Sequence, residues 1–365
     1  MLVEQHCIGS GFQFADNMGI YSELNGKDVL MNIKDEVKKI TPVFLLERKQ
    51  WLHLKHESFD QLKRFYNAIT HDGNNNVNHC VAKVTFYSHQ IEKGLSHSNF
   101  RYGFGKSALM NLSSALEDLK RCDSDYPECA AYQSAVAALQ EYRYRHENAG
   151  YHIDDMIALF PSDIWNDASA SVSANGGSVP VKASSKDGNA TIPFENLFLS
   201  RRSVREFSDS PLTETEIQHV IEVATKAPSV CNRQPVRVYA ITNKSVIEKA
   251  LKLQGGFNGY KVPPALFLIT ADNEAFLSIS EHNEGFVDGG LFSMALLMAM
   301  EANKIAACPL NTMFSKQIDR QTRNLIGVPE NEFLIMYIAA GHFPDETHTC
   351  ISKRYPVQNI LTVVK

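Results

Sequence analysis

The sequence predicts an α+β protein in which a mostly helical N-terminal domain precedes a layered α/β/α domain. In residues 191–365, helical patterns alternate with short apolar runs that are typical of buried strands. In residues 1–165, charged helical patterns predominate, as at 59–69 and 107–119. Between them, residues 166–190 are rich in Ser, Ala, Gly and Asn without apolar periodicity. This composition predicts a flexible linker and a domain boundary.

Length, charge and cysteine content narrow the class of protein. A chain of 365 residues is long enough for about two domains with buried cores. The 36 Lys and Arg residues against 41 Asp and Glu argue against a general nucleic-acid or membrane-surface binder. Seven cysteines without a C-x-x-C pair indicate reduced thiols and a cytoplasmic protein. The N-terminus does not resemble a secretory signal, and no apolar run approaches the length needed to cross a bilayer.

The C-terminal region divides into helices and strands by its periodicity. Thr213 and Glu216 form a T-x-x-E capping box that begins a helix, and Pro228 ends this helix. A short helix at 192–200 precedes it. The other expected helices are 245–254, 286–303 and 315–326, and the expected strands are 236–241, 264–270, 304–310 and 332–340.

The stretch from Arg201 to Pro235 carries the clearest chemical signal. Arg201, Arg202, Ser203 and Arg205 concentrate guanidinium groups and a hydroxyl, a grouping that suits a phosphate because planar guanidinium forks match its oxygens. A solvated basic helix end is the alternative interpretation. A polar turn then follows the helix. Its candidate ligand-binding residues, held between a helix and a strand, are Pro228, Ser229, Asn232 and Gln234.

These motifs resemble the signature of the nitroreductase family of FMN-dependent oxidoreductases. RRSVREF and APSVCNRQP are followed in order by FNGYK (257–261), DGG (288–290), CPLNT (308–312) and SKRYP (352–356). The resemblance covers roughly residues 192–365. It implies a nitroreductase-like domain that binds FMN at the interface of a homodimer, with NAD(P)H as co-substrate.

The resemblance also implies roles for individual residues. Lys261 and Asn258 would contact the edge of the isoalloxazine ring, where a cation favours reduction. Arg354, with Lys353 as a second candidate, would join Arg201, Ser203 and Arg205 at the phosphate. Arg202 is also a candidate, although neighbouring residues of a helix point apart. Ser229 and Asn232 would reach the flavin bound mainly by the partner chain. Residues along the flavin face would be Pro309, Leu310, Asn311 and Thr312, and the predicted catalytic residues are Lys261 and Asn311.

The implied activity is transfer of hydride from NAD(P)H through FMN to a small acceptor of nitroaromatic or quinone type. No G-x-G-x-x-G motif follows a strand, so a separate dinucleotide-binding domain is not indicated. Three alternatives remain open. One is a specialised flavin-dependent dehydrogenase or dehalogenase whose N-terminal domain recruits the substrate. Another is a non-catalytic protein that binds flavin or a partner, and a third makes the N-terminal half the functional domain.

Within the N-terminal region, the segment 88–105 contains His89, Glu92, Lys93 and Arg101. This segment could approach a ligand or cover the flavin, but a helix with an exposed charged face is the simpler interpretation. His53 and His56 lie three residues apart without a third ligand nearby, so the sequence predicts no metal site.

Overall fold

The computed structural model describes residues 42–69 and 76–365 of the chain. The chain forms two compact units, Met1–Tyr66 and Asn67–Lys365. Nearly all described residues of the first unit belong to one helix, α2 (Val43–Ala68), which ends two residues beyond Tyr66 and has no buried side chain. Residues 1–41 of the predicted N-terminal domain lie outside the described residues.

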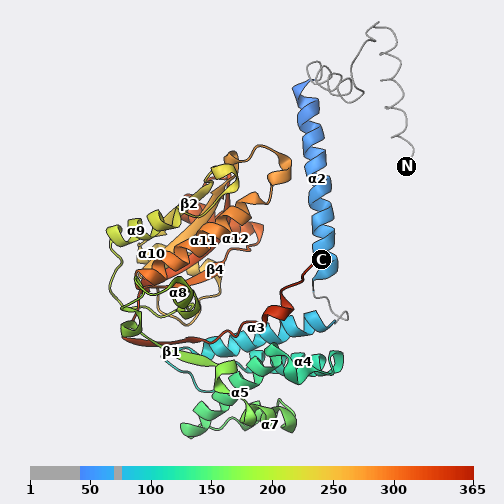
Figure 1. Ribbon diagram of the computed structural model, residues 1–365, viewed down its shortest axis with the longest axis vertical. Helices are drawn as coiled ribbons and strands as arrows, with labels where there is room; N and C mark the ends of the chain where they lie inside the picture. The colour runs from blue at the N-terminus through green and yellow to red at the C-terminus, as the bar shows by residue number, and fades with distance from the viewer. Residues whose placement is uncertain (1–41, 70–75) are drawn as a thin grey trace, which may run out of the picture. The chain divides into compact units, whose positions relative to one another are not determined.

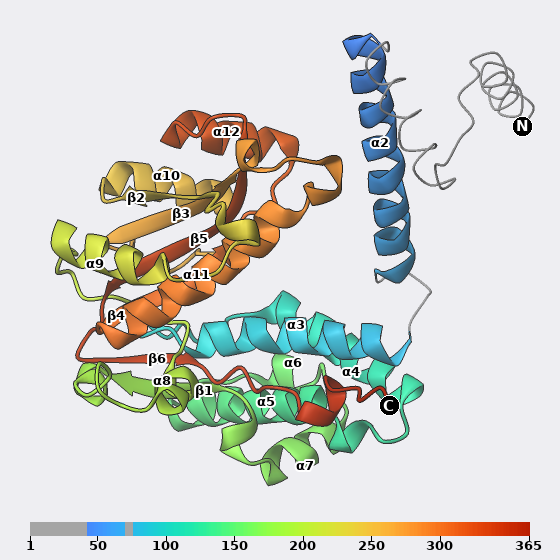
Figure 2. The same cartoon turned by 45° about the horizontal axis from the view of Figure 1, so that its top comes forward.

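The second unit begins with a helical bundle, which Figure 2 shows with α3, α4, α5 and α7 gathered together. Its core contains fully buried side chains from each long helix, such as Val84, Leu112 and Leu139. The described elements of residues 76–170 are helices without a strand, in line with the prediction of a mostly helical region. The helices are α3 (Val77–Leu95), α4 (Lys106–Cys122), α5 (Ala130–Asn148), α6 (Asp154–Ile157) and α7 (Ser162–Ala170).

A four-stranded antiparallel sheet in the order β2-β3-β5-β4 forms the centre of the C-terminal region (Figure 1). Its strands are β2 (Val236–Ile241), β3 (Ala265–Asp272), β4 (Ile305–Asn311) and β5 (Glu332–His342). The surrounding helices are α8 (Phe194–Ser200), α9 (Glu214–Ala224), α10 (Lys244–Gln254), α11 (Glu284–Ala302) and α12 (Lys316–Ile326). Each expected strand and helix of this region is present, and all ends lie within two residues of the prediction except the C-terminal end of α9, which stops at Ala224, ahead of Pro228.

Alternating side chains of β3 pack into different layers. Phe267 and Ile269 lie in one core with α9 and α11, whereas Leu266 and Leu268 lie in another core with α10. Successive residues of a strand point to opposite faces, so this mostly apolar strand is covered on both sides. Figure 2 shows α10 and α12 on one face of the sheet and α9 and α11 on the other. The α+β class with α/β/α layers is confirmed.

Helix α11 corrects one expectation from the sequence. By length and composition it is apolar enough to cross a membrane, the one such helix among the described residues. It packs here as a core helix, with Phe292, Leu296 and Met300 buried against the sheet. Gly289 lies so close to Ile335 of β5 that an added Cβ would stand 2.7 Å from that side chain.

The segment 166–190, expected to be a flexible linker, contains regular structure. It holds the end of α7 and strand β1 (Ser178–Lys182), which pairs with β6 (Glu346–Cys350) in a two-stranded antiparallel sheet. The sequence of β1 is short and contains Pro180, so its local pattern is weak, and its pairing partner lies more than 160 residues away. The unit Asn67–Lys365 runs through this segment undivided. A functional division between the two halves stays a prediction.

Candidate functional site

The arginine-rich segment begins at Arg201, the C-cap of α8, and continues in extended form beside β4. Val204 donates its N–H to the carbonyl of Ala307 at 3.0 Å, and Ser203 forms an isolated parallel bridge with the same residue. Val204 is fully buried, and Arg202 donates to the carbonyls of Leu199 and Arg201 at 2.7 and 3.0 Å. Alternate residues of an extended segment share a side, so Arg201, Ser203 and Arg205 face away from this core.

Arg201 carries the clearest unsatisfied group. Its Nη1 atom is buried and has no hydrogen-bond partner among the described residues. Burial lowers the pKa of Arg201, Glu301 raises it, and Arg354 lowers it further. Glu301 is already bound at 2.5 Å by the buried Lys186. A buried guanidinium donor without an acceptor is costly, so this position favours an anionic ligand.

Arg205 makes only long contacts. Its Nη1 atom lies 3.5 Å from the carbonyl of Ser203 and 3.5 Å from Sγ of Cys350, and its Nη2 atom lies 3.5 Å from Nε2 of His89. Among the described residues, no carboxylate forms an ion pair with Arg201 or Arg205 within 4.0 Å. Both side chains are partly buried, so donor capacity remains for a phosphate.

Helix α3 approaches the same place from the helical bundle. Lys93 donates to the carbonyl of Gly256 at 2.9 Å. Burial is the main cause that lowers the pKa of Lys93, and the positive charge of Arg205 lowers it further. Glu92 is only 2% exposed, and its Oε1 atom accepts the N–H of Gly177 at 3.1 Å. The expectation that this charged face is simply solvated is therefore wrong. Glu92 lies on the buried face of α3, together with Val84, Ser88, Ile91 and Leu95. A carboxylate at a position on this face was the signal in the sequence that could have shown that Glu92 is buried.

The described residues contain one group with the composition of a metal site. His89, Glu92 and Cys350 offer ligand atoms that lie within 4.8 Å of one another. The Arg205 guanidinium stands 3.5 Å from both the imidazole and the thiol. A divalent cation there would have to overcome this like charge, so the arrangement favours hydrogen bonding over metal binding.

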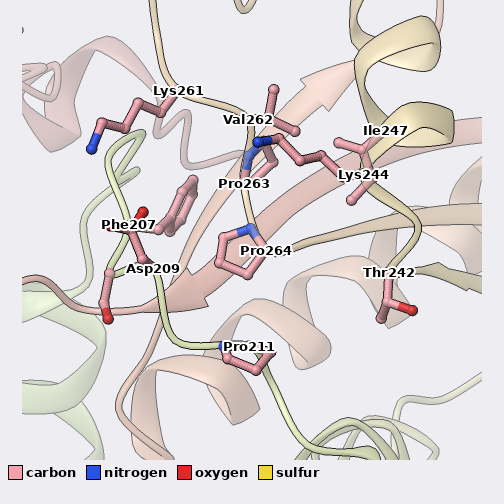
Figure 3. Close-up of a pocket in the computed structure, with 11 residues that line it drawn as sticks. Phe207, Asp209, Pro211, Thr242, Lys244, Ile247, Lys261, Val262, Pro263 and Pro264 are labelled. Carbon is pink, nitrogen blue, oxygen red and sulfur yellow. The ribbon is translucent and has the colours of Figure 1, made fainter.

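The loop that should contact the flavin edge lies beside the bundle. Tyr260 stacks on His97 with ring centroids 3.8 Å apart, and Asn258 donates to the carbonyl of Gly255 at 2.9 Å. Lys261 is exposed and lines a cavity of about 230 Å³ together with Phe207 and Lys244 (Figure 3). None of the arginines lines this cavity. We place the candidate site at the arginines because the unsatisfied buried donor lies there.

The polar turn after α9 is bonded within itself. Ser229 accepts the N–H of Gln234 at 3.0 Å, and Gln234 donates to the carbonyl of Asn232 at 3.2 Å. Asn232 and Gln234 have φ values of 56° and 51°, a costly conformation that is often found where a ligand is held. Pro228 is exposed beside them. In the described part of the chain, no hydrogen bond or ion pair joins this turn to the arginines, and a role toward a partner's flavin stays a prediction.

Of the remaining predicted residues, some are accessible to a ligand and others are buried or already hydrogen-bonded within the protein. Asn311 is exposed, whereas Leu310 is buried, and the buried Thr312 donates to the carbonyl of Leu334 at 3.1 Å. Pro309, beside them, is half-buried. A direct contact of the Thr312 hydroxyl with a ligand is thus disfavoured.

Of the C-terminal basic pair, only Arg354 lies near the arginines. It is close enough to Arg201 to lower the pKa of that guanidinium. Lys353 instead donates to Gln133 and Asn175 of the helical region, at 2.9 and 2.7 Å. Two neutral acceptors hold the lysine away from the candidate phosphate site, which supports Arg354 as the stronger of the two.

The fold and site together define an α+β domain with a partly buried cluster of arginines at the edge of its sheet. Residues 199–342 match the sequence model of the nitroreductase family, and they form a nitroreductase family domain. The residues before this domain have no family assignment.

Known proteins resemble this part of the chain at low identity. The "FMN reductase [NAD(P)H]" of Bacillus subtilis and the "NADPH-flavin oxidoreductase" of Vibrio harveyi are each 24% identical over 161 and 158 residues, respectively. Each comparison covers 40% of this chain and 64% of the relative, so the chain spans less than two thirds of their length. A crystal structure of a nitroreductase-like protein from Streptococcus mutans is 20% identical, covers 47% of this chain and 98% of its own, and has a TM-score of 0.41.

Proposed function

We propose that the protein is an FMN-dependent oxidoreductase that takes hydride from NAD(P)H and passes electrons to a small nitroaromatic or quinone-type acceptor. The observation that carries the proposal is the buried, unpartnered Nη1 atom of Arg201 inside a nitroreductase family domain. The names of the two bacterial relatives, which specify flavin and NAD(P)H or NADPH, support the same assignment.

The residues around Arg201 fit the phosphate group of FMN. Arg205 and Arg354 add guanidinium donors, and Ser203 adds a hydroxyl on the same side of the extended segment. Planar guanidinium forks bind phosphate oxygens in pairs, and the buried Nη1 atom of Arg201 gains the acceptor it lacks. When bound, FMN supplies reversible acceptance and delivery of hydride.

Other residues then serve the ring. Lys261, which is exposed at the end of its loop, places a cation near the ring edge where negative charge develops, and Asn258 precedes it on the same loop. Asn311 projects at the end of β4 and orients the acceptor. These roles require movement or adjustment of the loop, because Asn258 is bonded to Gly255 in this structure.

The proposed assembly is a homodimer in the cytoplasm. Apolar side chains remain exposed on α11 and α8, including Phe286, Val287 and Leu291 on the first helix. A cluster of exposed large apolar residues on a core helix is typical of an interface with another copy. The six described cysteines are free thiols, in keeping with a reducing compartment.

The test is the visible absorption spectrum of the purified chain before and after NADPH. We expect a yellow protein whose flavin bands bleach on addition of NADPH and return with a nitroaromatic or quinone acceptor. Bound flavin that NADPH and NADH both fail to reduce would favour the non-catalytic alternative.

A double variant tests the phosphate assignment. Arg201→Ala with Arg205→Ala removes both buried guanidinium groups, and we expect the protein to purify without FMN. The control is Arg202→Ala, because Arg202 bonds only to backbone carbonyls in this structure, and it should retain flavin. Full flavin occupancy in the double variant contradicts the assignment.

A further inference from the structure

Cations from both halves of the chain act on the pKa of one buried thiol. Cys308 on β4 is fully buried, and burial raises its pKa so that it stays neutral. Arg205, Lys93 and Arg201 each lie close enough to act on this pKa in the opposite direction. Two of these cations belong to the arginine segment, but Lys93 belongs to α3 of the helical bundle.

The end of α3 is fixed beside the arginines by two sets of contacts. Tyr260 donates its hydroxyl to the carbonyl of Lys93 at 3.1 Å and stacks on His97 at 3.8 Å between ring centroids. Ser98 donates both its N–H and its hydroxyl to Oε1 of Glu206, each at 2.8 Å. Glu206 follows Arg205 directly in the chain, so the position of Lys93 relative to the arginine segment is set on both sides.

The nearby carboxylates are occupied elsewhere. Glu206 is held by Ser98 and also accepts from Thr347 at 2.9 Å, and Glu301 is bound by Lys186 at 2.5 Å. Among the described residues, Lys93 forms no ion pair within 4.0 Å. Positive charges that are brought together and partly buried repel one another, and an anion between them offsets this cost.

We propose that Lys93 is a binding residue for the phosphate group of FMN, so that the helical region forms part of the cofactor site. This inference rests on the proposed function. A phosphate monoester carries close to two negative charges at neutral pH, which suits an ammonium group beside two guanidinium groups. Riboflavin has the same ring without the phosphate and provides the matched ligand for a test.

The experiment measures binding of FMN and of riboflavin to the flavin-free full-length chain by fluorescence titration. Lys93→Gln keeps an N–H donor for the carbonyl of Gly256 but removes the charge, and Lys93→Met removes both. Both variants should bind FMN about tenfold more weakly or worse, with riboflavin affinity unchanged. The control is Lys83→Met, which removes a lysine of the same helix that pairs with Asp118 and should leave both affinities unchanged.

Other results assign a different role to Lys93. If Lys93→Gln binds FMN like the wild type and only Lys93→Met loses affinity, the lysine is merely a tether to Gly256 and the inference is overturned. Equal loss of FMN and riboflavin also overturns it, because a phosphate contact cannot act on riboflavin. A wild-type chain that binds neither flavin removes the proposed function itself, and this inference with it.

Discussion

Arg201 shows how burial gives an ordinary basic residue a binding role. Its neighbour Arg202 carries the same group but donates hydrogen bonds to two backbone carbonyls. The Nη1 atom of Arg201 has no acceptor among the described residues. The extended conformation of the segment separates the two side chains. The alternation of an extended segment also puts Arg205 on the same side as Arg201. The site is therefore positively charged because two guanidinium groups share one side of the segment.

His89 provides a prediction at the same scale. Hydrogen bonds with Cys350 and then Glu92 raise the pKa of His89 to about 9, against the opposing effects of burial and Arg205. A protonated histidine that the fold stabilises contributes fully below its unfolded pKa of about 6.5, and the contribution is lost as pH rises through about 9. Because the side chain is 40% exposed, solvent screening reduces the effect.

We therefore expect the melting temperature of the wild type to exceed that of His89→Gln by the most near pH 6. The difference should shrink between pH 7 and pH 9.5. Thermal unfolding of both proteins across this range measures it, with His219→Gln, an exposed histidine of α9, as the control. A difference that is constant with pH would show that His89 stays neutral in the folded protein.

At the scale of elements, local patterns predict what local physics decides. The four strands of the central sheet and helices α8 to α12 follow from periodicity, and the capping box of Thr213 and Glu216 is present. Strands β1 and β6 pair across nearly half of the chain, and no local pattern encodes such a pairing. The position of α3 beside Arg205 also depends on tertiary contacts. The sequence therefore predicts the arginines of the candidate site, but for the segment with Lys93 it offers both a ligand contact and a solvated face and does not decide between them.

The adjacent glycines of α11 give a matched pair of variants. A Cβ on Gly289 would meet Ile335 at 2.7 Å, and the contacted atoms are close to the backbone of a β-branched residue that cannot easily move. Gly289→Ala should therefore destabilise the protein by about 1–3 kcal/mol. A Cβ on Gly290 meets nothing within 4 Å, so Gly290→Ala should be neutral or stabilise by up to about 1 kcal/mol.

Urea unfolding of the two variants and the wild type gives both free energies. The measurement also tests the packing of α11 against β5, because only that contact distinguishes the two positions. If Gly289→Ala is as stable as the wild type, the helix and the sheet are not this close.

At the scale of the whole molecule, the helical bundle and the C-terminal region are joined at several places. The β1 and β6 strands form one sheet, Lys353 bonds to Gln133 and Asn175, and α3 contacts the loop at Tyr260. These ties involve the segments on either side of the candidate site. The helical region is thus placed to influence the site, which a freely linked recruiting domain would not be.

The exposed apolar residues of α11 lead to the last prediction. Leu291 is 45% exposed on a helix whose other side is buried in the core, and a second copy would cover it in the proposed dimer. Leu291→Glu places a charge in that interface, which cannot be desolvated without a partner. We expect light scattering after gel filtration to show a dimer for the wild type and a shift toward monomer for the variant.

FMN occupancy should fall in parallel if Ser229 and Asn232 of the second copy complete the site. Val172→Glu, an exposed apolar position of the helical region, should change neither mass nor occupancy. A wild type that is monomeric with full FMN occupancy would contradict the proposed assembly while leaving the phosphate site intact.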